Sequence, residues 1–155
     1  MNVLVLCTGN SARSILLECI LNKLGDGRVK AYSAGSRPVG KVHPMALRLL
    51  ATLGYKTSHL RSKSWNEFAT PDAPKMGIVV TVCGSAAEEV CPIWPGAPIR
   101  IHWGIDDPAA VPEEDQETAF EVTYSILESR GSSLLNLPLE AMDQDQLAAE
   151  LSRIS

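Results

Sequence analysis

The sequence predicts an α/β protein built on a parallel β-sheet. Short, continuous apolar runs typical of strands covered on both faces recur along the chain, and segments with helical spacing of apolar residues lie between them. The expected strands are residues 3–6, 29–33, 76–82 and 98–102. Because crossovers in such a sheet are right-handed, the functional crevice is expected where the strands have their carboxyl ends.

Four helices are expected between and after these strands. They begin after residue 14, at Pro44, near Pro112 and just before Leu147, and a short helix is possible within the polar segment 58–68. The first helix should end at Gly25 or Gly27, and 34–36 should form the turn after the second strand. The apolar positions that define the first and the longest helix are Ile15, Leu16, Cys19, Ile20 and Leu24, and Ala119, Val122, Ile126, Leu127 and Leu134.

Composition indicates a single domain over residues 1–155, with the balance of apolar and charged residues that soluble globular proteins have. A net charge of -4 argues against nonspecific binding to nucleic acid. The N-terminus resembles no secretory signal, and no apolar run reaches the roughly 20 residues that span a membrane, so a cytoplasmic protein is expected. Its four cysteines, Cys7, Cys19, Cys83 and Cys91, then point to catalysis, redox chemistry or metal binding.

The most informative stretch is residues 7–14, directly after the first strand. A strand that breaks into a glycine-containing loop before a helix directs several backbone N–H groups into one concavity, which binds anions. We expect a substrate-binding cradle made of Thr8, Gly9, Asn10, Ser11, Ala12, Arg13 and Ser14. At its floor, Cys7 would be favoured as a thiolate, with Arg13 forking two oxygens of a tetrahedral oxyanion and Ser14 donating to the sulfur. A buried cysteine before an ordinary turn is the alternative, and it explains fewer of these residues.

A second cysteine pair follows the third strand. Ser85 and Glu88 form a capping-box pattern, so a helix of little more than one turn is expected between Cys83 and Cys91. In that helix the two cysteines would lie about 12 Å apart, but so short a helix is marginal and can melt to let them approach. This arrangement suits a redox switch. The alternatives are a core cysteine with an incidental surface one, or a metal site, for which the Cys-x7-Cys spacing is wrong.

The Cys-x5-Arg-Ser pattern of residues 7–14 resembles the loop of the low-molecular-weight tyrosine phosphatase superfamily, and the chain from residue 3 to about 135 looks more like its thioredoxin-coupled arsenate reductases. The resemblance implies a three-layer fold whose sheet has the strand order 2-1-3-4, with helices on both faces. Strands one and three are then neighbours about 4.8 Å apart, a separation at which Cys7 and Cys83 can form a disulfide.

The resemblance also implies a mechanism. Cys7 attacks arsenate, Cys83 attacks Cys7 and releases arsenite, and Cys91 attacks Cys83 to restore Cys7. An external thiol donor such as thioredoxin or glutaredoxin then resets the enzyme, and no cofactor is expected. The alternatives that stay open are a low-molecular-weight protein tyrosine phosphatase acting on phosphomonoesters and a phospho-ligand binding module without turnover.

By motif match, the aspartate that precedes a proline, Asp107, protonates the leaving oxygen, while Asp106 is expected to be solvated or a local turn acceptor. The phosphatases of the superfamily usually continue with an aromatic residue that lines the phosphotyrosine cleft. Here Ala109 and Ala110 follow instead, which weakens the phosphatase interpretation.

Residues outside the loop are expected to support it. Asn10 should hold the loop by bonding neighbouring backbone, with Ser33 as a partner behind it. Some members of the superfamily bind potassium near the residues corresponding to Asn10, Glu18 and Ser33, but this chain offers Lys63 there, whose ammonium can replace the ion; no metal is expected.

Other candidates are assigned structural roles or none. Cys19 is expected to be a buried helix cysteine, and His102 to pack with Trp103 at a strand end. His43 and His59 belong to no recognisable constellation.

Overall fold

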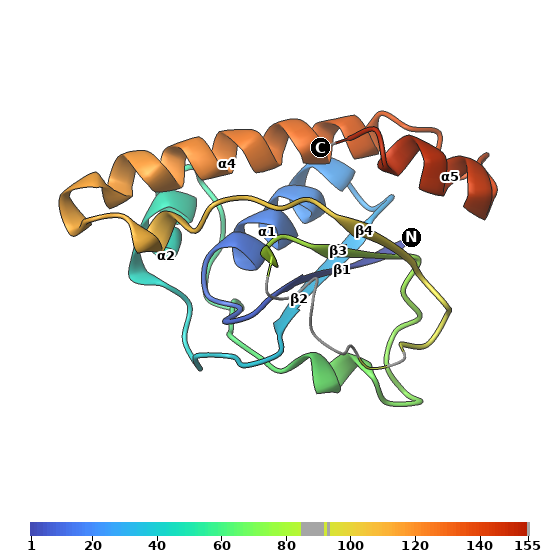
Figure 1. Cartoon of the computed structure of the whole chain (residues 1–155), viewed down its shortest axis with the longest axis horizontal. Coiled ribbons are helices and arrows are strands. Elements are labelled where there is room, and N and C mark those ends of the chain that lie inside the picture. The colour runs from blue at the N-terminus through green and yellow to red at the C-terminus, as the bar shows by residue number, and fades with distance from the viewer. Residues whose placement is uncertain (85–91, 93, 155) are drawn as a thin grey trace.

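The computed structural model describes residues 1–84, 92 and 94–154. Its sheet contains four parallel strands in the order β2-β1-β3-β4, which confirms the expected topology (Figure 1). The strands are β1 (Asn2–Cys7), β2 (Lys30–Gly35), β3 (Ile78–Thr81) and β4 (Ile99–His102). The register places Cys7 opposite Gly35 and Leu6 opposite Thr81, so the carboxyl ends of the strands share one edge.

The helices are distributed unequally over the two faces of the sheet. The helices are α1 (Arg13–Gly25), α2 (Pro44–Thr52), α4 (Glu113–Leu135) and α5 (Gln144–Leu151), with the short 3-10 helices η1 (Trp65–Phe68) and η2 (Pro108–Ala110). Helix α4 crosses over α1 on one side of the sheet, whereas η1, green in Figure 1, lies on the other side. Helices α2, α4 and α5 begin close to where the sequence predicts them, at Pro44, Glu113 and Gln144.

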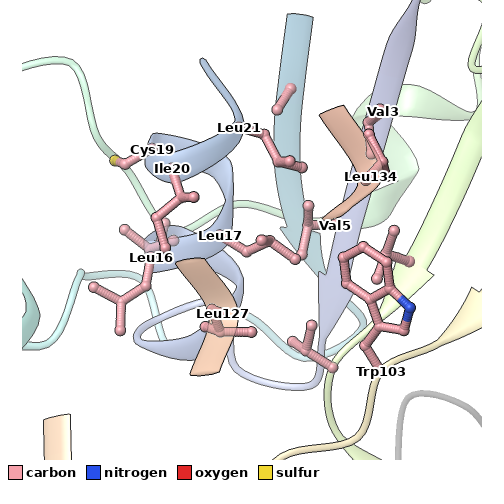
Figure 2. Packing of buried hydrophobic residues seen from close by; sticks show 14 of the residues in the cluster. Val3, Val5, Leu16, Leu17, Cys19, Ile20, Leu21, Trp103, Leu127 and Leu134 are labelled. Atoms are coloured by element: carbon pink, nitrogen blue, oxygen red, sulfur yellow. The ribbon is translucent and has the colours of Figure 1, made fainter. Parts of the chain in front are cut away.

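Strand β1 separates two hydrophobic clusters, which explains its unbroken apolar sequence. Val3 and Val5 face the larger cluster with α1 and α4, and Leu4 and Leu6 face the smaller one under η1. All four side chains are fully buried. Figure 2 shows Val3 and Val5 meeting leucines of α1 and α4, with Trp103 closing the cluster.

Helices α1 and α4 bury most of the apolar residues expected to face the core, including Ile15, Leu16, Cys19, Ile20, Leu127 and Leu134, but three are exposed. Leu24, Val122 and Ile126 are 41%, 53% and 38% exposed. In α4 the buried row passes through Phe120, Thr123, Leu127, Gly131 and Leu134. A side chain at Gly131 would press on Ile20 of α1, so this glycine sets how closely the two helices approach. The apolar residues of α4 occupy two adjacent rows, and the close contact with α1 selects the row that contains the glycine.

Strand β2 extends through Ala34 and Gly35, two of the three residues for which a turn was predicted. A Cβ atom at Gly35 would collide with the carbonyl oxygen of Thr8, so this position brings the end of β2 directly against the 7–14 loop. Within the described ranges, no helix is both long and apolar enough to cross a membrane.

Candidate active site

Cys7 lies at the carboxyl end of β1 and is buried, with two polar groups directed at its sulfur. The backbone N–H of Asn10 donates to Sγ at 3.2 Å, and Ser14 Oγ lies 2.9 Å from Sγ. Because Asn10 Nδ2 already donates to the Ser14 oxygen at 2.8 Å, the Ser14 hydroxyl proton is left for the sulfur. Both donors stabilise negative charge on Cys7, as the sequence predicted for Ser14.

Asn10 connects the loop to the rest of the fold. It is fully buried, it adopts a left-handed conformation with φ of 46°, and Nδ2 also donates to Ser33 Oγ at 3.0 Å. Its Oδ1 accepts from the backbone N–H of Lys63 at 2.9 Å. The expected contact with Ser33 is confirmed, but the expectation of neighbouring backbone partners is wrong. Besides Ser14 in the loop itself, the side chain reaches Ser33 on β2 and the backbone amide of Lys63.

The outer side of the loop is held by residues 36–43. Three carbonyl groups of the loop accept hydrogen bonds from backbone amides of that segment at 2.9–3.0 Å. The pairs are Thr8 with Arg37, Gly9 with Val39, and Ser11 with His43. Because a trans peptide places each N–H opposite the preceding carbonyl, the following amides face away from this segment. The Asn10 amide faces away in this manner and donates to Cys7 Sγ. Backbone N–H groups that point into the loop are what an oxyanion-binding site requires.

Cys83 lies beside the loop, two residues beyond Thr81, where the neighbouring strand β3 ends. The Val82 amide donates to the Leu6 carbonyl at 2.9 Å, which carries the register of β1 and β3 to the sheet edge. Cys83 Sγ accepts from the Thr8 amide at 3.3 Å and lies 3.4 Å from the Thr8 hydroxyl oxygen. The second sulfur therefore contacts the residue that follows Cys7. Cys91 and the short helix expected before it lie outside the described residues.

Arg13 connects the loop with the Asp107 segment. Its Nη1 donates to the Ile105 carbonyl at 3.0 Å, and Nη2 lies 3.8 Å from Asp107 Oδ2. Asp107 is 44% exposed, and its Oδ1 accepts from the Ala109 amide at 3.0 Å. Asp107, at the N-cap of η2, is therefore the acceptor in this turn, and not Asp106. Asp106 is exposed to solvent, which is the other of the two expectations for it.

Behind the loop, Lys63 and Glu18 form a buried ion pair. The ammonium donates to the Arg61 carbonyl at 3.1 Å and to Ser33 Oγ at 3.4 Å, and it lies 3.7 Å from Glu18 Oε1. Burial raises the pKa of Glu18 and lowers the pKa of Lys63, and each partner's charge opposes the shift of the other. Lys63 thus contacts Glu18 and Ser33, two of the residues where the resemblance would place a potassium ion. In the part of the chain that the structure describes, no group of three His, Cys, Asp or Glu side chains could hold a metal.

The remaining candidates have structural surroundings. Cys19 is buried in α1, and burial raises the pKa of its thiol to about 12, so it stays an unreactive thiol. His43 caps α2, its Nδ1 accepting from the Met45 amide. The expected packed pair at the end of β4 is wrong: Trp103 is buried, but His102 is exposed and bonds to Thr81, because successive residues of a strand point to opposite faces.

Two loop contacts were not predicted. The contact of Thr8 with Cys83 follows from the register of β1 and β3, so it could have been predicted from the expected order of the strands. Ser62 Oγ donates to the Gly9 carbonyl at 3.1 Å and accepts from the Gly40 amide at 3.2 Å. No sequence pattern marks Ser62, because both partners are backbone groups more than 20 residues away.

Comparison with known proteins places this geometry in a family. The family model described as low molecular weight phosphotyrosine protein phosphatase matches residues 2–148. The chain belongs to this family.

Proteins similar to this chain in sequence include several arsenate reductases. The arsenate reductase of Halalkalibacterium halodurans is 38% identical over 112 residues, which cover 72% of this chain and 77% of the relative. A solved arsenate reductase in the phosphate binding state superposes with a TM-score of 0.69 at 25% identity, covering 86% of this chain and 95% of the other. The thioredoxin-dependent arsenate reductase Cg_ArsC1' of Corynebacterium glutamicum gives 0.61 at 26% identity, covering 85% and 60%.

Proposed function

We propose that this protein is an arsenate reductase that converts arsenate to arsenite through a relay of cysteine thiols. The observation that carries the proposal is the position of Cys83, whose sulfur contacts Thr8 directly beside the Cys7 loop. Ester hydrolysis needs one thiol, whereas transfer of two electrons to arsenic needs a second thiol within reach of the first. The arsenate reductases among its relatives support the same activity.

The first step is attack of the Cys7 thiolate on arsenate held by the loop amides and Arg13. A sulfur–arsenic bond forms, an arsenic–oxygen bond breaks, and the leaving oxygen departs as water with a proton from Asp107. The loop amides and the Arg13 guanidinium stabilise the charge on the remaining oxygens. Arg13 is already braced on the Ile105 carbonyl beside Asp107, which brings the anion-binding and proton-donating groups together.

The second step transfers the electrons. Cys83 attacks the Cys7 sulfur, a disulfide forms, and the sulfur–arsenic electron pair leaves with arsenic, which is thereby reduced to arsenite. Donation from the Thr8 amide stabilises the attacking Cys83 thiolate. Cys91 then attacks Cys83 and releases Cys7 as a thiolate, so the disulfide moves to Cys83 and Cys91.

An external dithiol protein of the thioredoxin or glutaredoxin class reduces the final disulfide. A thioredoxin-dependent relative with the same fold supports the first of these donors. The relay takes its electrons from thiols, so it requires no resident cofactor or metal. It also requires a reducing compartment, for which we propose the cytoplasm.

Phosphomonoester hydrolysis is the second candidate function, favoured by the family and by the pairing of Arg13 with Asp107. Ala109 and Ala110, in place of an aromatic residue, argue against an aryl phosphate as its main substrate. A phospho-ligand binding module, the third possibility, predicts a Cys7 that does not react with alkylating agents at neutral pH.

The test is a disulfide map by mass spectrometry after the fully reduced protein meets arsenate without a thiol donor. We expect a Cys83–Cys91 disulfide in the unmodified chain and a Cys7–Cys83 disulfide in Cys91→Ser, with phosphate giving neither. Cys19→Ser is the matched control, since this buried thiol lies outside the relay, and it should give the same map. Three free relay cysteines after arsenate, together with steady hydrolysis of an aryl phosphate, would reject the reductase and favour the phosphatase.

A further inference from the structure

The segment 103–107, called here the acid loop, has three consecutive carbonyl groups that accept hydrogen bonds from arginine side chains. Arg130 Nη1 lies 3.1 Å from the Trp103 oxygen and 3.2 Å from the Gly104 oxygen. Arg13 Nη1 donates to the next carbonyl, that of Ile105, at 3.0 Å. Two cations thus hold the backbone that leads into Asp107.

Other bonds hold both ends of this loop. At its end, the Asp107 carbonyl accepts from the Ala110 amide at 3.1 Å and Asp107 Oδ1 accepts from the Ala109 amide at 3.0 Å. The Trp103 amide donates to the Thr81 carbonyl and the Ile105 amide to the Val82 carbonyl, at 2.8 and 3.1 Å, and the Trp103 indole is buried in the core. Beyond Ile105, both aspartates are exposed. Between these ends, Arg130 donates to the carbonyls of the Trp103 and Gly104 peptide planes. The Gly104 plane is also held by the bond from the Ile105 amide to Val82, so Arg130 fixes it from the other side.

Arg130 is suited to fix those planes. Among the described residues, no carboxylate lies within ion-pair distance of Arg130, and its guanidinium donates to the acid-loop carbonyls. It directly precedes Gly131, where α4 packs tightly against Ile20 of α1. The guanidinium therefore extends from a part of α4 that is fixed to the core. A charged donor to a carbonyl gives a stronger bond than a neutral one, so a single side chain can fix both planes.

We propose that Arg130 is a positioning residue for the proton-donating aspartate. It contacts neither Cys7 nor the loop amides; it orients the acid loop so that the Asp107 carboxyl stays beside Arg13 and faces the anion bound there. The inference deepens the proposed function and rests on it for the role of Asp107. The brace itself, Arg130 on the two carbonyls, does not depend on the substrate.

The brace is tested first without turnover, by hydrogen–deuterium exchange of the full chain. Arg130→Gln should speed exchange of the Ile105, Asp106 and Asp107 amides about tenfold, while amides of β1 and α4 keep their rates. Arg130→Lys, which can still donate to one carbonyl, should give a smaller change. Arg153→Gln is the matched control, since Arg153 is exposed near the C-terminus and pairs with Glu150. Unchanged exchange of the acid loop in Arg130→Gln would overturn the proposal.

The link to Asp107 is tested by a double-mutant cycle on the single-turnover formation of the Cys7–Cys83 disulfide with arsenate. The parent chain for this cycle is Cys91→Ser, because Cys91 restores the Cys7 thiol in the unmodified chain. Arg130→Gln should slow this step about tenfold in the parent chain, and less than twofold in an Asp107→Asn background, because the group that Arg130 positions no longer donates a proton. Equal losses in both backgrounds would mean general damage and would overturn the proposal. If the Cys91→Ser parent chain never forms the Cys7–Cys83 disulfide with arsenate, the proposed function fails, and the exchange experiment alone decides whether Arg130 holds the acid loop.

Discussion

The two halves of the candidate site are built in opposite ways. The Cys7 loop is held from within the fold: Asn10 and Ser14 are fully buried, and bonds reach them from β2 and from Lys63. The acid loop lies at the surface, with Asp107 exposed and its backbone braced by arginines. Changes in the first half should therefore cost stability as well as activity, whereas changes in the second should cost activity alone.

The largest effect is expected from Asn10→Ala. The change removes the hydrogen bonds to Ser14, Ser33 and the Lys63 amide. Ser14 keeps its contact with Cys7 and Ser33 keeps the Lys63 ammonium, but the buried Lys63 amide loses its Asn10 partner. Each unsatisfied group costs about 1–3 kcal/mol, and a Cβ at positive φ adds strain in the absence of the asparagine amide. We expect a loss of about 3 kcal/mol in the free energy of unfolding, measured by urea denaturation, and no arsenate-dependent disulfide.

Asn10→Gly separates the two contributions. Glycine accepts the positive φ without strain but makes none of the bonds, so it should be more stable than the alanine variant by about 1 kcal/mol. If both variants have the same free energy of unfolding as the parent chain, the contrast between a buried Cys7 loop and a surface acid loop is wrong.

The next effect, Asp107→Asn, acts on the exposed half. The amide oxygen still accepts from the Ala109 amide, so the turn is kept, but the side chain no longer supplies a proton. In a Cys91→Ser chain, arsenate-dependent formation of the Cys7–Cys83 disulfide should slow about 100-fold, which corresponds to about 2.7 kcal/mol in the barrier. The free energy of unfolding should stay within about 0.5 kcal/mol of the parent value. A large loss of stability would show that the acid loop contributes to the stability of the fold, against the contrast drawn above.

The sequence was sufficient for the parts of the site that are local. Cys7, Arg13 and Ser14 lie within eight residues, and strand edges brought Cys83 to Thr8 and Asp107 to Arg13, because parallel strands end on one side of the sheet. The order of the strands came from the resemblance, since periodicity alone does not fix it.

The remaining contacts link residues far apart in the chain and leave no periodic signal. Asn10 bonds to the amide of Lys63, 53 residues later, and Arg130 reaches Trp103 across 27 residues. A backbone partner can be supplied by any residue type, so such contacts depend on the packed fold. The buried row of α4 was likewise decided by a tertiary contact at Gly131, which local pattern does not reveal.

The buried pair behind the loop carries a pH signature. Because burial raises the pKa of Glu18 above its ordinary value of 4.5, the folded chain holds a proton that the unfolded chain has lost, and this group lowers stability as pH rises from about 4.5 through the raised pKa. The charge of Lys63 opposes this shift. Burial lowers the pKa of Lys63 itself, so that group raises stability with pH only in the alkaline window below 10.5.

Lys63→Met, the smallest of these effects, extends the contrast to the support behind the Cys7 loop. It leaves the Glu18 carboxylate buried without a cation, so the pKa of Glu18 should rise further and the destabilising window should move to higher pH. At about pH 7.5 we expect urea denaturation to show a loss of about 2 kcal/mol, falling to less than about 1 kcal/mol at pH 5, where protonation relieves the buried charge. The double variant with Glu18→Gln removes both charges and should recover most of the stability at both pH values. An equal loss at both pH values would mean that Lys63 supports the loop only through its bonds to Ser33 and the Arg61 carbonyl, and that its charge contributes nothing.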